Sequence, residues 1–128
     1  MDIFFPDPND PPLPPEAVRL RSLRAEPWPD SPRVKVFLEL TPFEKRPSAE
    51  VILTGPDGAE SARTAILESI SRRLEFNLHL PSGSPPGEYT LHVTLYYQKL
   101  PPAEQPEAPM PPPLVVDQGE LSFTIPPR

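Results

Sequence analysis

The sequence predicts an all-β protein in which seven antiparallel strands form a two-sheet sandwich. Apolar and polar residues alternate in short runs, with the period of two that a half-buried strand requires. Turn-forming residues separate these runs and do not interrupt them. The chain also contains 24 prolines in 128 residues. Because proline removes a backbone donor and clashes inside a helix, a mainly helical fold is excluded.

The clearest alternation occupies residues 86–97, which we expect to form a central strand. It begins with the turn-forming pair Pro86-Gly87. The side that would face the core carries Tyr89, Leu91, Val93, Leu95 and Tyr97. The opposite side would face outward and carries Thr90, His92, Thr94 and Tyr96.

The length of the chain suits one domain and leaves no room for a second. Residues 1–15 hold six prolines and three aspartates and cannot form a core, so they are expected to be a proline-rich N-terminal arm. Residues 16–128 would be a single sandwich domain, in which the proline-rich segment 99–113 forms a stiff projecting loop. The tip of the arm contains the apolar residues Ile3, Phe4 and Phe5.

The other strands are expected, in chain order, at 17–25, 33–41, 48–54, 59–68, 72–80 and 114–125. In the first of these, Leu23 breaks the alternation and indicates a bulge or bend. The residues at 59–68 fit an irregular strand or a short helical turn, and the strand is preferred because the reversal at 55–58 suits a hairpin. In the last strand, Gly119 is expected to mark a bulge.

Apart from 59–68, these strands present their apolar residues mainly to one side. In chain order they are Val18 and Leu20; Val34, Val36, Leu38 and Leu40; Ala49, Val51 and Leu53; Leu74, Phe76, Leu78 and Leu80; and Leu121, Phe123 and Ile125. The apolar residues of 59–68, namely Ala62, Ala65, Ile66 and Leu67, fit an irregular strand and a short helical turn equally well. Half-buried strands at this spacing are typical of an antiparallel sandwich.

The final hairpin of immunoglobulin-like and fibronectin type III-like domains resembles two runs of this sequence, Pro86-Gly87-Glu88-Tyr89-Thr90-Leu91-His92-Val93 and Leu121-Ser122-Phe123-Thr124-Ile125. The resemblance implies Greek-key connections, with Tyr89 at the tyrosine-corner position, where its phenol hydrogen-bonds to nearby backbone. The chain lacks the paired cysteines and the third-strand tryptophan of antibody domains, so the resemblance is to the wider superfamily. It implies no specific activity.

Composition excludes several functional classes. The formal net charge of −6, from 18 acidic and 12 basic side chains, would repel a polyanion, so nucleic acid is not an expected partner. Cysteine is absent, which excludes disulfides, thiol catalysis and cysteine-ligated metals. No apolar run approaches the roughly 18 residues of a membrane helix, and the N-terminus has no recognisable secretory signal. A cytoplasmic location is therefore expected.

The sequence predicts no catalytic, cofactor or metal site, and we expect no enzymatic activity. His79 and His92 fall at outward positions of strands that a sandwich places in opposite sheets, so they cannot share a metal ion or a charge relay. The carboxylates are scattered singly beside basic residues, as exposed ion pairs are. Asp7, Asn9 and Asp10 form the only cluster suited to calcium, and the prolines between them argue against it.

The two outer faces of the sandwich are expected to differ. One would pair its charges across strands and carries Arg19, Arg21, Arg33, Lys35 and Arg73 with Glu39 and Glu75. The other would be almost without charge, which fits either a partner surface or simply good strand formers. It carries Ile52, Thr90, His92, Thr94, Tyr96 and Thr124. Trp28 would plug an open end of the sandwich or contact a ligand, and the plug is preferred.

Two hypotheses of function follow. The first is a non-enzymatic interaction or structural subunit that binds a protein partner or copies of itself through the arm and the uncharged face. Its candidate contact residues are Ile3, Phe4, Phe5, Trp28, Ile52, His92, Thr94 and Tyr96. The second is a small carbohydrate- or peptide-binding module that uses loop residues, namely Trp28, Phe43 and the segment 99–113.

Overall fold

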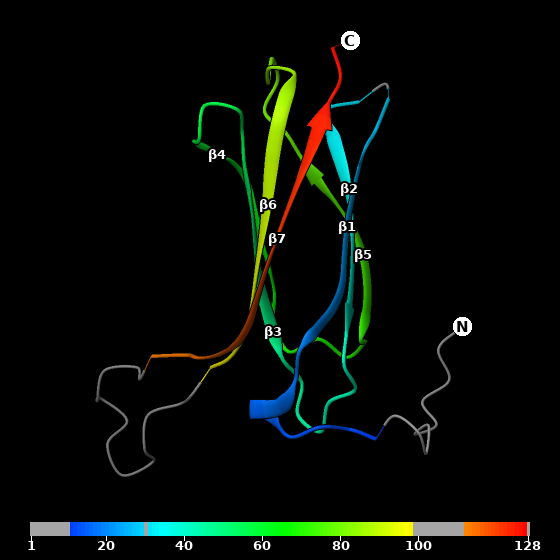
Figure 1. Cartoon of the computed structure of the whole chain (residues 1–128), viewed down its shortest axis with the longest axis vertical. Coiled ribbons are helices and arrows are strands. Elements are labelled where there is room, and N and C mark those ends of the chain that lie inside the picture. The colour runs from blue at the N-terminus through cyan, green and yellow to red at the C-terminus, as the bar shows by residue number, and fades with distance from the viewer. Residues whose placement is uncertain (1–10, 30, 99–111, 128) are drawn as a thin grey trace.

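The computed structural model describes residues 11–29, 31–98 and 112–127. These residues form seven antiparallel strands in two packed sheets, the β-sandwich that the sequence predicts (Figure 1). The tip of the arm, with Ile3, Phe4 and Phe5, and most of the segment 99–113 lie outside the described residues.

The two sheets have three and four strands. The three-stranded sheet has the order β1-β2-β5, with bounds Leu20–Pro27, Arg33–Leu40 and Arg73–His79. The four-stranded sheet has the order β4-β3-β6-β7, with bounds Glu60–Ile66, Ser48–Thr54, Gly87–Tyr97 and Leu114–Ile125. A short 3-10 turn, η1 (Pro15–Ala17), precedes β1. The chain crosses between the sheets after β2, β4 and β5, which gives the Greek-key connectivity.

The stretch whose structure the sequence left open, 59–68, contains strand β4 and confirms the preferred interpretation. The reversal before it is a tight turn, in which the backbone N–H of Gly58 donates to the carbonyl of Gly55 at 3.0 Å. Gly58 has a φ of +82°, a left-handed conformation that glycine adopts without steric cost. Because this turn fixes the hairpin, β4 pairs with β3 along its length.

The core consists of the inward rows that the alternation predicts. These side chains are buried between the two sheets, where each removes apolar surface from water, and burying a large aliphatic one contributes about 1.5–3 kcal/mol. They are Val18, Val34, Val36, Leu38, Leu40, Ala49, Val51, Leu53, Leu78, Leu80, Tyr89, Leu91, Val93, Leu95 and Ile125.

Three register shifts, each a β-bulge or irregularity, interrupt the regular pairing. In β4 the shift falls at Ser61, since Leu53 of β3 lies opposite Ala62 and Thr54 lies opposite Glu60. In β1 the register shifts between Leu20 and Ser22, which places the expected irregularity at Arg21. In β7 the register shifts at Val116, since Leu95 of β6 lies opposite Asp117 and Tyr96 lies opposite Val115. The bulge predicted at Gly119 is therefore wrong.

Gly119 pairs regularly with Val93 and serves a different purpose. The Leu20 side chain of β1 occupies the space that a Cβ atom at position 119 would need. Glycine inside a strand marks either a bulge or a close approach, and here it permits the close approach of β1 to β7. Beside it, the backbone N–H of Leu20 donates to the Asp117 carboxylate at 2.8 Å, which links the neighbouring edges of the two sheets.

Tyr89 forms the contact that the tyrosine-corner resemblance implies. Its phenol donates to the carbonyl oxygen of Pro85 at 2.7 Å, while its ring is fully buried. The ring also stacks against Phe123 of β7, with 6.3 Å between the ring centroids. Tyr89 thus fastens the β5–β6 connection to the core at the start of β6.

The described end of the arm is joined to the domain. Leu13 forms a parallel bridge with Phe43 in the β2–β3 connection. Its N–H donates to the carbonyl of Pro42, and its carbonyl accepts from the N–H of Glu44. The arm therefore enters the domain at the end where β2 finishes and β3 begins, which is the lower end in Figure 1.

We predict that Gly119→Ala destabilises the protein by about 1 kcal/mol, because the new methyl group overlaps the end of the Leu20 side chain, which must shift at a partly buried contact. Chemical denaturation measures the change. Adding Leu20→Ala should make the double variant lose less stability than the sum of the two single losses. The exposed control Thr124→Ala on the same strand should stay within about 0.5 kcal/mol of the parent. Equal stability of Gly119→Ala and the parent would contradict the close approach.

We predict that Tyr89→Phe lowers the free energy of unfolding by about 1 kcal/mol, because it removes one hydrogen bond and retains the buried ring. Thermal and urea unfolding measure the loss. Tyr89→Ala should cost about 3–5 kcal/mol, since it also leaves a cavity. If both substitutions cost the same, the hydroxyl does not contribute.

Candidate partner-binding surfaces

The structure brings four of the predicted contact residues onto the outer face of the four-stranded sheet. Ile52 of β3 lies directly opposite His92 of β6. Thr94 and Tyr96 follow on β6 at the same outward spacing, because side chains on one face recur every second residue. All four side chains are partly exposed.

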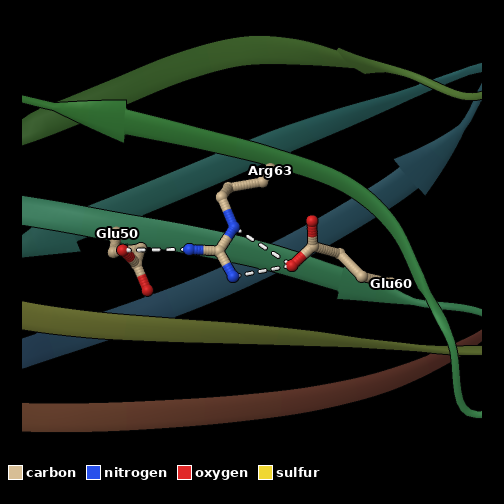
Figure 2. Close-up of polar contacts among 3 residues, drawn as sticks. All are labelled: Glu50, Glu60 and Arg63. Carbon is tan, nitrogen blue, oxygen red and sulfur yellow. Dashed lines mark hydrogen bonds and ion pairs between the residues drawn. The ribbon is translucent and has the colours of Figure 1, made fainter.

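This face carries more charge than the sequence predicts, which corrects the expectation of an almost uncharged surface. Glu50 is two residues before Ile52 and therefore shares its face, opposite Thr94. Figure 2 shows Arg63 of β4 between two carboxylates, at 3.5 Å from Glu50 and 2.7 Å from Glu60. The hydrogen bond and charge of Glu60 raise the pKa of Arg63. The alternation of single strands could not show which charges β4 adds to the face, because this depends on the register of β4 against β3.

His92 lies among polar neighbours on the same face. Its Nδ1 is 3.5 Å from a carboxylate oxygen of Glu120, and its Nε2 is 3.5 Å from the hydroxyl of Thr54. His79 is on β5 in the other sheet, as predicted, so the two histidines do not act together. Among the described residues, no group of three or more His, Asp and Glu side chains is placed to hold a metal ion.

Trp28 does not plug the end of the sandwich, so this prediction is wrong. Its indole N–H donates to the side-chain oxygen of Asn77 at 2.8 Å, and the guanidinium of Arg33 lies 4.1 Å from the ring centre. Asn77 and Arg33 occupy outward positions on β5 and β2, so the indole packs over the outer face of the three-stranded sheet. This position satisfies the indole N–H, which the apolar core would not do. A sugar stacking on the covered face of the ring would have to displace Arg33.

The outer face of the three-stranded sheet pairs part of its predicted charges across strands, while Arg19 lies before β1 and Arg21 lies at its bulge. Lys35 of β2 is 2.7 Å from Glu75 of β5, and Arg73 of β5 is 3.6 Å from Glu39 of β2. Both pairs join neighbouring strands. These are exposed ion pairs, so each contributes about 0–1 kcal/mol to stability.

The sequence did not reveal a set of exposed aliphatic residues at the lower end of the sandwich. Leu67 and Ile70 in the β4–β5 connection are 71% and 63% exposed, and Leu114 and Val115 at the start of β7 are 36% and 47% exposed. We call these four the lower-end aliphatic residues. They are the exposed large apolar side chains of the part of the chain that the structure describes. The predicted strands contain Leu67, Leu114 and Val115 without clean alternation at these positions, and Ile70 lies between two predicted strands, so the pattern gave no indication of which way these side chains point.

The connection that carries Leu67 and Ile70 is held firmly. The N–H of Glu68 donates to the Ser48 hydroxyl at 3.0 Å, and the N–H of Ser69 donates to the carbonyl of Pro47 at 2.8 Å. The Ser69 hydroxyl donates to the carbonyl of Ser71, and Ser69 itself is buried. Glu68 has a φ of +47°, a left-handed conformation that is uncommon outside glycine and is maintained by surrounding contacts. The two aliphatic side chains are therefore displayed on fixed backbone.

An open groove lies at the opposite, upper end. It encloses about 430 Å³ between the β5–β6 connection and the end of β7. Its lining consists of small and apolar residues without an ionisable side chain, namely Pro32, Leu80, Ser82, Gly83, Ser84, Pro85, Pro86, Ile125 and Pro126. Such a lining offers shape and a few hydroxyl groups, and no acid, base or cation.

Comparison with known proteins does not assign the chain to a family. No protein-family model matches it, and no curated protein matches it significantly. Within the described residues, no helix is long and apolar enough to cross a membrane.

Tyr97 provides a pH-dependent test of packing at the lower end. Its phenol donates to the carbonyl of Lys45 at 2.8 Å, and burial raises its pKa above the ordinary value of about 10. The unfolded chain ionises first as the pH rises, so this contribution to stability is complete below about pH 10 and is lost as the pH rises through the folded-state pKa. Urea denaturation across this range should show the parent losing more stability than Tyr97→Phe. Parallel losses would mean that the phenol is not shielded.

Proposed function

We propose that this protein is a non-enzymatic interaction or structural subunit, and that it meets a protein partner, or another copy of itself, at the lower end of the sandwich. The observation that carries the proposal is the display of Leu67 and Ile70 on a connection fixed by hydrogen bonds to Pro47 and Ser48. In the free protein, both side chains are largely exposed to solvent. A partner surface would cover them.

We further propose that the sandwich belongs with immunoglobulin-like, and in particular fibronectin type III-like, domains. The strand orders β1-β2-β5 and β4-β3-β6-β7 support this, together with the hydrogen bond from Tyr89 to Pro85. Domains of this architecture occur in many unrelated functions, so the fold does not define the activity.

The fixed backbone favours binding, because little conformational entropy is lost when a partner covers the side chains. Burying a large aliphatic side chain contributes about 1.5–3 kcal/mol, and the neighbouring contacts add to this. Leu67 follows β4 and Val115 belongs to β7, which are the two edge strands of the four-stranded sheet. Three strand spacings, or roughly 14 Å, separate these edges. An interface of typical size, about 800 Å² on each partner, is wide enough to include both.

The predicted contact residues on the outer face take a secondary place in this proposal. Tyr96 lies opposite Val115 and extends the apolar surface from the lower end onto the sheet. Ile52 and His92 lie farther up, beside Arg63 and Glu120, where a partner would have to desolvate charged groups. We therefore expect Tyr96 to contribute to binding and Ile52 to be peripheral.

We predict that Leu67→Lys combined with Ile70→Lys abolishes association without unfolding the domain, because both positions are exposed in the free protein. Cross-linking in the source cells, followed by mass measurement of the adducts, compares this variant with the parent. Glu88→Lys is a matched control, since it changes the net charge by the same two units at an exposed site outside the lower end. The parent and Glu88→Lys should give the same discrete adducts, and the double variant should not.

Two results would refute this placement of the surface: adducts that persist in the double variant, or their absence from all three proteins. Light scattering of the purified parent identifies the partner class, because a mass above that of the monomer indicates a second copy. Circular dichroism confirms that each variant is folded.

A further inference from the structure

The outer face of the three-stranded sheet combines aromatic rings with cationic side chains. Phe37 lies near the middle of β2, with the Arg24 guanidinium 4.4 Å and the Lys35 ammonium 5.6 Å from its ring centre. At the upper end, Arg33 lies over Trp28. Both rings are only partly buried. The face therefore offers apolar contact and positive charge together.

The charges on this face do not cancel. The outward cations are Arg24, Arg33, Lys35 and Arg73, and the outward carboxylates are Glu26, Glu39 and Glu75. Each carboxylate lies near one cation, since the ion pairs are Arg24 with Glu26, Lys35 with Glu75, and Arg73 with Glu39. Arg33 is left over: its Nε donates to the Ser31 hydroxyl, and it forms no ion pair with a described carboxylate. Four cations against three carboxylates give +1, on a chain whose net charge is −6.

The segment before Pro11 has the complementary chemistry. Residues 1–10 contain three aspartates, no lysine or arginine, and the apolar run Ile3-Phe4-Phe5. Pro6 and Pro8 lack a backbone N–H, so this segment is poorly suited to extend a sheet as an added strand. It is better suited to contact a sheet face through its side chains.

The point of entry gives the segment the necessary reach. Leu13 is anchored beside Phe43, just beyond the end of β2. Phe37 lies six residues before Phe43, so at the rise of a strand the two are roughly 20 Å apart. Phe5 lies eight residues before Leu13, and an extended chain of that length spans up to about 28 Å, which is enough to reach Phe37. A fully extended segment would also carry Asp2 as far along the sheet as Arg33. In Figure 1 the described chain begins at the lower end, on the side of β5.

We propose that residues 1–10 dock on the outer face of the three-stranded sheet of their own chain. Phe4 and Phe5 pack against Phe37 and the stems of Arg24 and Lys35, and an aspartate pairs with Arg33. This surface differs from the lower-end surface of the proposed function, so either proposal can fail without the other. Docking within one chain also shields the two phenylalanines from unrelated partners.

Paramagnetic relaxation tests the docking in the full chain. The protein contains no cysteine, so Pro6→Cys gives a single position for a spin label beside Phe5. The label should broaden the backbone amide resonances around Phe37 and Lys35. It should broaden those of His92 and Thr94 much less, because they lie in the other sheet, about 10 Å farther away. Adding Phe4→Ser and Phe5→Ser to the labelled protein should abolish the broadening.

Arginine variants of the labelled protein test the charge contact. Arg33→Gln should lower the equilibrium constant for docking about 2- to 5-fold, as removal of one exposed charge pair does, and the broadening should weaken in step. Arg63→Gln on the other sheet is the matched control and should change nothing. Raising the salt concentration to about 1 M should act in the same direction as Arg33→Gln, because it screens exposed charges.

Three results would overturn the proposal. The first is broadening that is absent, or that is unchanged by the phenylalanine substitutions. The second is broadening centred on His92 and Thr94, which would place the segment on the four-stranded sheet. The third comes from mixing spin-labelled protein with isotope-enriched unlabelled protein: broadening as strong in the mixture as within one chain would make a second copy the site of docking.

Discussion

The packing of alternate apolar side chains between the two sheets is the constraint on which the rest of the structure depends. Val36 in β2 and Val93 in β6 are both buried, and a strand turns successive side chains to opposite sides. Once such residues face inward, the outward positions are fixed as well, because a slip of one residue would move the whole apolar row into water. The bulges at Arg21 and Val116 lie in β1 and β7, which form the neighbouring edges of the two sheets.

The same constraint produces two outer faces with different chemistry. On the three-stranded sheet, the guanidinium groups of Arg24 and Arg33 lie over the rings of Phe37 and Trp28. On the four-stranded sheet, Arg63 reaches from the edge strand toward two carboxylates. Neither face is a continuous apolar surface. We therefore place the proposed partner surface at the lower end of the sandwich and not at the centre of a sheet.

At the lower end, hydrogen bonds determine the conformation where alternation does not. Pro47 and Ser48 hold the backbone of the β4–β5 connection, and Glu68 takes a left-handed conformation there. Leu67 and Ile70 consequently point into solvent, although large apolar side chains are usually buried. The two proposals use separate parts of the molecule: this end for a partner, and the outer face of the three-stranded sheet for the chain's own first residues.

The sequence by itself determined the class of fold, the seven strands and their inward rows, because alternation and proline spacing are local properties of the chain. It also indicated the role of Tyr89, which contacts Pro85 only four residues away. The tertiary structure alone decided what depends on residues far apart in the chain. The Leu20 side chain fills the space beside Gly119, so only glycine fits there without a shift. Contacts with Asn77 and Arg33 determine where Trp28 lies, and Arg63 places a charge beside Ile52. Such neighbours are set by strand order and register, which no single run of residues contains.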